Sequence, residues 1–143
     1  MPDAAAEPLL DNEFVSVRHA EQGGVIRVTR TSAAITTLEE IETAWGGVSR
    51  ALSTVDRHRH VLLMDMRRAR GRNDDAFERA VAPHRAATVS GFARVAVLVQ
   101  TMPGKLQVQR HVREDRLGEV RIFDSERDAV AWLLEARAAR PAR

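Results

Sequence analysis

The stretch Arg59-His60-Val61-Leu62-Leu63-Met64-Asp65-Met66 decides how the rest of the chain is expected to fold. Its apolar run is almost unbroken and carries charges only at its ends, which is typical of a central strand covered on both faces, as in a parallel sheet. A second β-branched apolar run, residues 92–100 (FARVAVLVQ), predicts a second central strand. Two such strands indicate an α/β domain.

Helical patterns alternate with strand patterns along the chain. Apolar residues recur at three- and four-residue steps from Leu38 to Val55, and Thr36-Thr37-Leu38-Glu39-Glu40 offers a capping-box start for that helix. Further helices are predicted over residues 75–90, 101–115 and 125–135, and shorter strands over 14–20, 25–30 and 119–123. The predicted order, β-β-α-β-α-β-α-β-α, indicates a single mixed, mainly parallel sheet with an N-terminal antiparallel hairpin and helices packed on it.

Two features interrupt the predicted helices. Gly46-Gly47 lies inside the first helix, so that helix is expected either to bend there or to have a close neighbour. Pro83 lies inside the second helix and is expected to kink it or to divide it in two.

The size and composition fit one domain. The chain has 143 residues, of which 44% are apolar and 29% charged. We predict a flexible leader over residues 1–12, the folded domain over 13–136 and a basic C-terminal tail over 137–143. With no cysteine, no secretory signal and no apolar run of membrane-spanning length, the expected location is the cytoplasm.

Charge and aromatic content do not indicate a nucleic-acid surface. The 22 basic and 20 acidic residues nearly balance, giving a net charge of +2. Aromatic residues make up only 4% of the chain and tyrosine is absent, so a base-stacking platform is not predicted.

The strand ending Leu63-Met64-Asp65-Met66 and the closing stretch EVRIFDSERDAVAWL (residues 119–133), in this order of elements, resemble the STAS superfamily. The narrower resemblance is to the SpoIIAA-like, or STAS/SEC14, branch of bacterial proteins, and it covers residues 14–135. It implies a regulatory protein-binding module that is not an enzyme and carries no cofactor.

Anti-sigma-factor antagonists of this superfamily bind a kinase or an anti-sigma factor through the loop and helix after the third strand. A serine in that loop is phosphorylated to release the partner. Here Asp65-Met66 matches the start of the family's Asp-Leu-Ser-Gly motif, but Arg67 stands where the first serine would be. No serine or threonine lies between His60 and Ala87, so the sequence does not support this phosphorylation switch. The residues predicted to bind a protein partner are Arg67, Arg68, Arg70, Arg72, Asp74 and Asp75.

The SEC14-like side of the resemblance implies a second possibility, a groove for a lipid or another small apolar ligand. Arginines beyond the carboxyl end of a parallel strand, with Lys105 after the next strand, would hold an anionic group there. The candidate ligand-binding residues are Arg67, Arg70, Arg72 and Lys105. The simpler interpretation is a solvated loop whose arginines pair with Asp74, Asp75 and Glu78, and Asp74 can equally be a helix N-cap. A homodimer is also compatible with the sequence.

No assembled catalytic or metal site is predicted. The nucleophile-elbow and phosphate-loop motifs are absent. His58 and His60 would share one side of a strand but supply only two metal ligands, and the other histidines are scattered. Asp65 ends an apolar strand, where it is either a buried carboxylate with a raised pKa, hence a general-base candidate, or a structural partner of loop amides.

Overall fold

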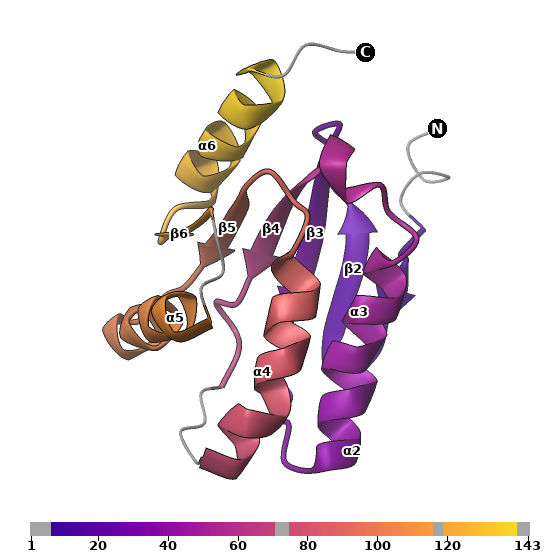
Figure 1. Ribbon diagram of the computed structural model, residues 1–143, viewed down its shortest axis with the longest axis vertical. Coiled ribbons are helices and arrows are strands. Elements are labelled where there is room, and N and C mark those ends of the chain that lie inside the picture. Colours follow the sequence, from indigo (N-terminus) through magenta and orange to yellow (C-terminus); the bar gives the residue numbers. More distant parts are fainter. Residues whose placement is uncertain (1–6, 71–74, 116–118, 140–143) are drawn as a thin grey trace.

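One mixed sheet forms the centre of the molecule (Figure 1). The computed structural model describes residues 7–70, 75–115 and 119–139. The six strands lie in chain order, with β1 to β3 antiparallel and β3 to β6 parallel. They are β1 (Leu10–Asp11), β2 (Val15–His19), β3 (Val25–Arg30), β4 (Val61–Asp65), β5 (Val95–Leu98) and β6 (Val120–Phe123). The predicted fold class, a mixed and mainly parallel sheet with an opening hairpin, is confirmed.

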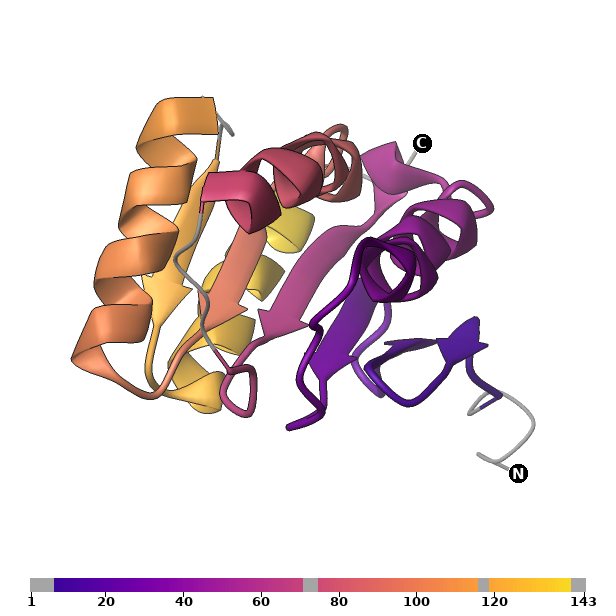
Figure 2. The same ribbon diagram turned by 90° about the horizontal axis from the view of Figure 1, so that it is seen from below.

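Helices cover both faces of this sheet. The helical elements of the described residues are α2 (Leu38–Ile41), the π-helical turn η1 (Glu42–Gly46), α3 (Gly47–Leu52), the 3-10 turn η2 (Arg57–Arg59), α4 (Asp75–Val89), α5 (Met102–Asp115) and α6 (Glu126–Ala139). Figure 2 shows α3 and α4 above one face, α6 below the other, and α5 beside β6 at the edge of the sheet. No helix in the described ranges is long and apolar enough to cross a membrane.

The alternation of side chains along each strand builds two cores. Ile26 and Val28 of β3, with Leu62 and Met64 of β4, pack under α2, α3 and α4. The intervening residues of the strands pack against α6: Val25, Val61, Leu63, Ala96 and Leu98. Every residue of β4 is buried, as expected for a strand covered on both faces.

The first helix begins, and becomes irregular, where the sequence suggests. Thr37 is its N-cap, and a reciprocal capping box joins Thr37 to Glu40. The π-helical turn ends at Gly46, which gives the predicted irregularity at the glycine pair. A Cβ on Gly47 would lie 3.2 Å from Leu10 Cδ2, so the buried backbone at Gly47 also has a close neighbour in β1.

Three details differ from the sequence-based expectations, and a fourth decides between two alternatives. The segment expected as a flexible leader contributes β1, which pairs with β2. His58 lies in η2 and His60 precedes β4, so these histidines do not share one side of a strand. The helix α6 extends to Ala139, beyond the start of the expected tail. Pro83 lies inside α4, which is one continuous helix, so of the two alternatives for this proline the division of the helix is excluded.

Candidate functional site: an apolar pocket beside α4 and α5

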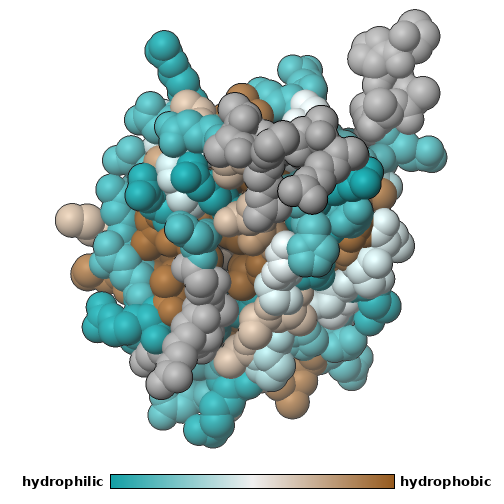
Figure 3. Space-filling view, turned by 45° about the horizontal axis from the view of Figure 1, so that its top comes forward, coloured by the Kyte–Doolittle hydropathy of each residue, from teal (hydrophilic) through white to brown (hydrophobic). Residues whose placement is uncertain are grey.

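A pocket of about 570 Å³ lies between α4, α5 and the sheet. Most of its lining is apolar because the strands present their α4-side residues there and both helices turn apolar side chains toward it. Figure 3 shows apolar surface reaching the exterior between hydrophilic side chains. The apolar lining includes Trp45, Met64, Met66, Phe77, Val81, Val89, Val97, Val99, Val108, Val112 and Val120.

A polar bridge between α4 and α5 forms part of the pocket lining. Glu78 Oε1 lies 2.6 Å from His111 Nε2 and accepts a 3.3 Å hydrogen bond from Arg110 Nη2. Arg85 Nη1 is 3.9 Å from the same oxygen. Glu78, Arg85 and His111 line the pocket, and their side chains are only 19%, 16% and 12% exposed. A carboxylate on α4 therefore holds basic groups of both helices at the pocket wall.

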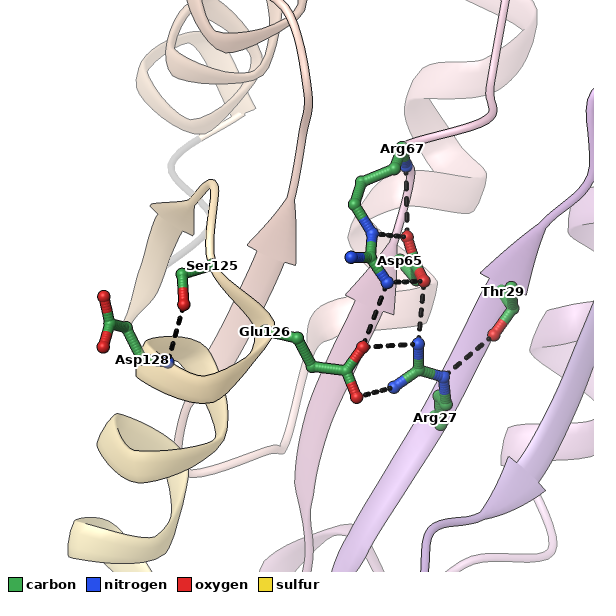
Figure 4. A network of polar contacts seen from close by, with 7 residues as sticks. All are labelled: Arg27, Thr29, Asp65, Arg67, Ser125, Glu126 and Asp128. Atoms are coloured by element: carbon green, nitrogen blue, oxygen red, sulfur yellow. Dashed lines mark hydrogen bonds and ion pairs between the residues drawn. The ribbon is translucent and has the colours of Figure 1, made fainter.

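A second polar cluster lies on the α6 side of the sheet (Figure 4). Asp65 Oδ2 accepts hydrogen bonds from Arg27 Nη2 and Arg67 Nη2, each 2.7 Å long. Glu126, in the first turn of α6, accepts from Arg27 at 3.0 and 3.1 Å and from Arg67 at 3.0 Å. The cluster thus joins the interior of β3 and the end of β4 to the start of α6.

Asp65 in this cluster does not have the raised pKa that made it a general-base candidate. Burial opposes ionisation of its carboxyl group, but hydrogen bonds from Arg67 and the charges of Arg67 and Arg27 outweigh burial and lower its pKa. Hydrogen bonds from Arg27 similarly lower the pKa of Glu126, and the bond to Asp65 raises the pKa of Arg67. The structural alternative for Asp65 holds, because its Oδ1 also accepts from the Arg67 backbone N–H at 3.2 Å.

The structure separates the arginines expected to act together. Arg67 belongs to the α6-side cluster, whereas the exposed Arg70 lines the pocket on the opposite face. Arg68 is exposed on the same loop, and Asp75 is the exposed first residue of α4. Lys105 pairs with Asp124 at 3.2 Å and does not line the pocket. Arg72 and Asp74 lie outside the described residues, so the predicted partner and ligand sites stay predictions.

Comparison with known proteins identifies the fold. No family model matches the chain, and no curated protein matches it. A similar solved structure is that of an uncharacterised protein from the DUF3478 family of Shewanella loihica PV-4, described as having a SpoIIAA-like fold. The two share a TM-score of 0.61 and 18% identity over 87% of this chain and 98% of the other. The fold is SpoIIAA-like. At this identity, the similarity establishes the architecture and no function.

The sequence analysis did not place four ionisable residues in the pocket, namely Arg30, Glu78, Arg85 and His111. Glu78 and His111 are 33 positions apart, and no local pattern indicates that α4 and α5 bring them together. The position of Arg30, in contrast, could have been predicted from the sequence. It follows Ile26 and Val28 at two-residue steps, so the alternation of β3 places its side chain on a buried face.

Proposed function

We propose that this protein is a non-enzymatic binding module whose pocket between α4, α5 and the sheet holds a small apolar ligand. The observation that carries the proposal is the pocket itself. Its volume of about 570 Å³ lies within the range of about 300 to 1,000 Å³ that is usual for small-ligand sites. Its mostly apolar lining with a few polar groups is also typical of such sites.

The position of the pocket supports the same role. Met66 and Ala69, beyond the carboxyl end of β4, and Val99 and Thr101, beyond the end of β5, contribute to its lining. Open α/β sheets commonly bind ligands near the carboxyl ends of parallel strands. The SpoIIAA-like fold supports a binding rather than a catalytic role. The lining of the pocket, mostly apolar with a few polar groups, also suits binding.

Intrinsic fluorescence can test this proposal directly. Trp45 lines the pocket, whereas Trp132 packs in the core on the α6 side. Titration with the neutral apolar probe N-phenyl-1-naphthylamine should quench Trp45 by energy transfer and saturate at one probe per chain. Val108→Phe, which fills the pocket from α5, should weaken binding, whereas Leu134→Phe on exposed α6 surface should leave it unchanged. Equal binding by the wild type and Val108→Phe would contradict the proposal.

A second candidate function is recognition of a protein partner through the loop and helix after β4. The observation that favours it is the exposure of Arg68, Arg70 and Asp75, a mixed-charge surface that suits electrostatic recognition. By resemblance, the partner would be an anti-sigma factor or a kinase-like protein. Native mass spectrometry of the protein from its own source would identify a stoichiometric partner. An Arg68→Ala/Arg70→Ala variant that retained the same partner at the same occupancy would argue against this surface.

A further inference from the structure

Arg30 places a positive charge in the wall of the apolar pocket. It is the last residue of β3, and it is only 3% exposed. The alternation of β3 puts its side chain on the face of Ile26 and Val28, beneath the helices, and Arg30 lines the pocket together with Ile35 and Trp45. A buried arginine among such neighbours needs an electrostatic explanation, because arginine stays ionised in proteins.

The contacts of Arg30 do not balance its charge. Its Nη1 donates to the backbone carbonyl of Phe14, and its Nη2 donates to that of Ala33 at 3.1 Å. Both acceptors are neutral, and within the described part of the chain no carboxylate forms an ion pair with Arg30. Burial lowers the pKa of Arg30, and no neighbouring charge opposes this shift. A buried charge without a counter-charge is costly unless a ligand supplies one.

The hydrogen bonds of Arg30 within the described residues do not use all of its donor groups. A guanidinium has five N–H donors. The two carbonyl contacts use two of them, so three N–H groups have no acceptor among the described residues. The wider pocket is also positive, because Arg30, Arg70 and Arg85 line it against a single carboxylate, Glu78, in the described ranges. Both observations favour an anionic over a cationic ligand.

Resting on the proposed function, we propose that Arg30 is the anchor for the head group of the pocket ligand. The ligand class is an amphiphile with one oxyanion, a carboxylate or a phosphate, and an aliphatic body. The oxyanion pairs with the Arg30 guanidinium through charge-assisted hydrogen bonds, and the body fills the space lined by Met64, Val81 and Val97. This assigns the anion site to β3, away from the loop arginines predicted from the sequence.

Three probes that share a twelve-carbon chain test the assignment on the full chain: dodecanoate, dodecyl phosphate and the neutral dodecanol. Binding is followed below the critical micelle concentration through Trp45 fluorescence and calorimetry. At least one anionic probe should bind about tenfold or more tightly than dodecanol, since hydrogen bonds to charged groups are the strong ones. The preferred anion, carboxylate or phosphate, then identifies the head group.

Three variants test whether Arg30 causes the preference for the anionic probes. Arg30→Gln should remove the preference for the anion, Arg30→Lys should keep part of it, and Arg50→Gln on the exposed surface of α3 should keep all of it. The comparison of probes on the wild type needs no variant, so the test stands even if Arg30→Gln fails to fold. Equal affinity for all three probes would overturn the Arg30 assignment and leave the apolar pocket intact. No binding of any probe would overturn the proposed function as well.

Discussion

Arg67 holds the carboxylate of Asp65, two residues earlier, in a bidentate fork, with Nε 2.9 Å from Oδ1 and Nη2 2.7 Å from Oδ2. The same Nη2 lies 3.0 Å from Glu126 Oε1 at the start of α6. The Asp65 side chain is only 9% exposed, so its contacts are shielded from water more than those of a surface ion pair. Arg67, which follows the end of β4, therefore connects that strand to the start of α6.

Asp65→Asn should destabilise the fold by about 2 kcal/mol. The amide keeps the shape of the side chain but leaves Arg27 and Arg67 without the carboxylate that both contact. Urea denaturation near neutral pH measures this loss. Asp124→Asn is the control, because Asp124 is 69% exposed in its pair with Lys105 and such pairs contribute less than about 1 kcal/mol. Equal effects of the two substitutions would contradict the role of the cluster.

Acid should weaken the same cluster. The pKa values of Asp65 and Glu126 are lowered from their ordinary 3.8 and 4.5, so the folded state binds protons less readily than the unfolded state. Their contribution is fully present above those ordinary values and is lost as the pH falls through the lowered ones. Urea denaturation over this range should show the difference between the wild type and Asp65→Asn shrinking below pH 3.8. A difference independent of pH would exclude ionised Asp65 as its source.

Glu78→Gln should loosen α5. Its carboxylate is the acceptor that joins α4 to His111 and Arg110, and the neutral amide cannot hold two basic side chains equally well. We expect a loss of about 1 kcal/mol and faster amide hydrogen exchange in α5 than in α6. Glu42→Gln is the matched control, because Glu42 is 61% exposed in its pair with Arg50. Unchanged exchange in α5 would show that the apolar contacts alone hold this helix.

Much of the fold was predictable because strand and helix periodicities report burial directly. The uniformly apolar β4 and the capping box at Thr37 both identified their elements from a few adjacent residues. β1 was missed because two residues at an edge carry no periodicity of their own. Leu10 pairs with Val17 and packs on Gly47. Neither contact is indicated by the residues next to Leu10 in the sequence.

The candidate site was less predictable because charge pairing is a tertiary property. The loop after β4 contains several arginines that sequence alone places together, yet Arg67 turns to the α6 side and Arg70 to the pocket. The partners that decide this, Arg27 and Glu126, are 99 positions apart and carry no shared motif. The charged residue that sequence could have indicated is Arg30, through the two-residue alternation of β3.

Gly91→Ala should destabilise the protein by about 1 to 2 kcal/mol. Gly91 follows the end of α4 with φ of +88°, a left-handed conformation that costs an L-residue with a Cβ roughly this much. The new Cβ would also lie 3.3 Å from Arg57 Cδ, and Arg57 donates to the carbonyls of Ala87 and Ser90 that close the helix.

Thermal and urea denaturation both measure the effect of Gly91→Ala. Gly23→Ala is its control, because a Cβ at Gly23 meets nothing within 4 Å and that glycine has no positive φ. The control should change stability by less than about 0.5 kcal/mol. If Gly91→Ala proved as mild as Gly23→Ala, the turn would accept a different backbone conformation, and α4 would not depend on glycine for its C-terminal end.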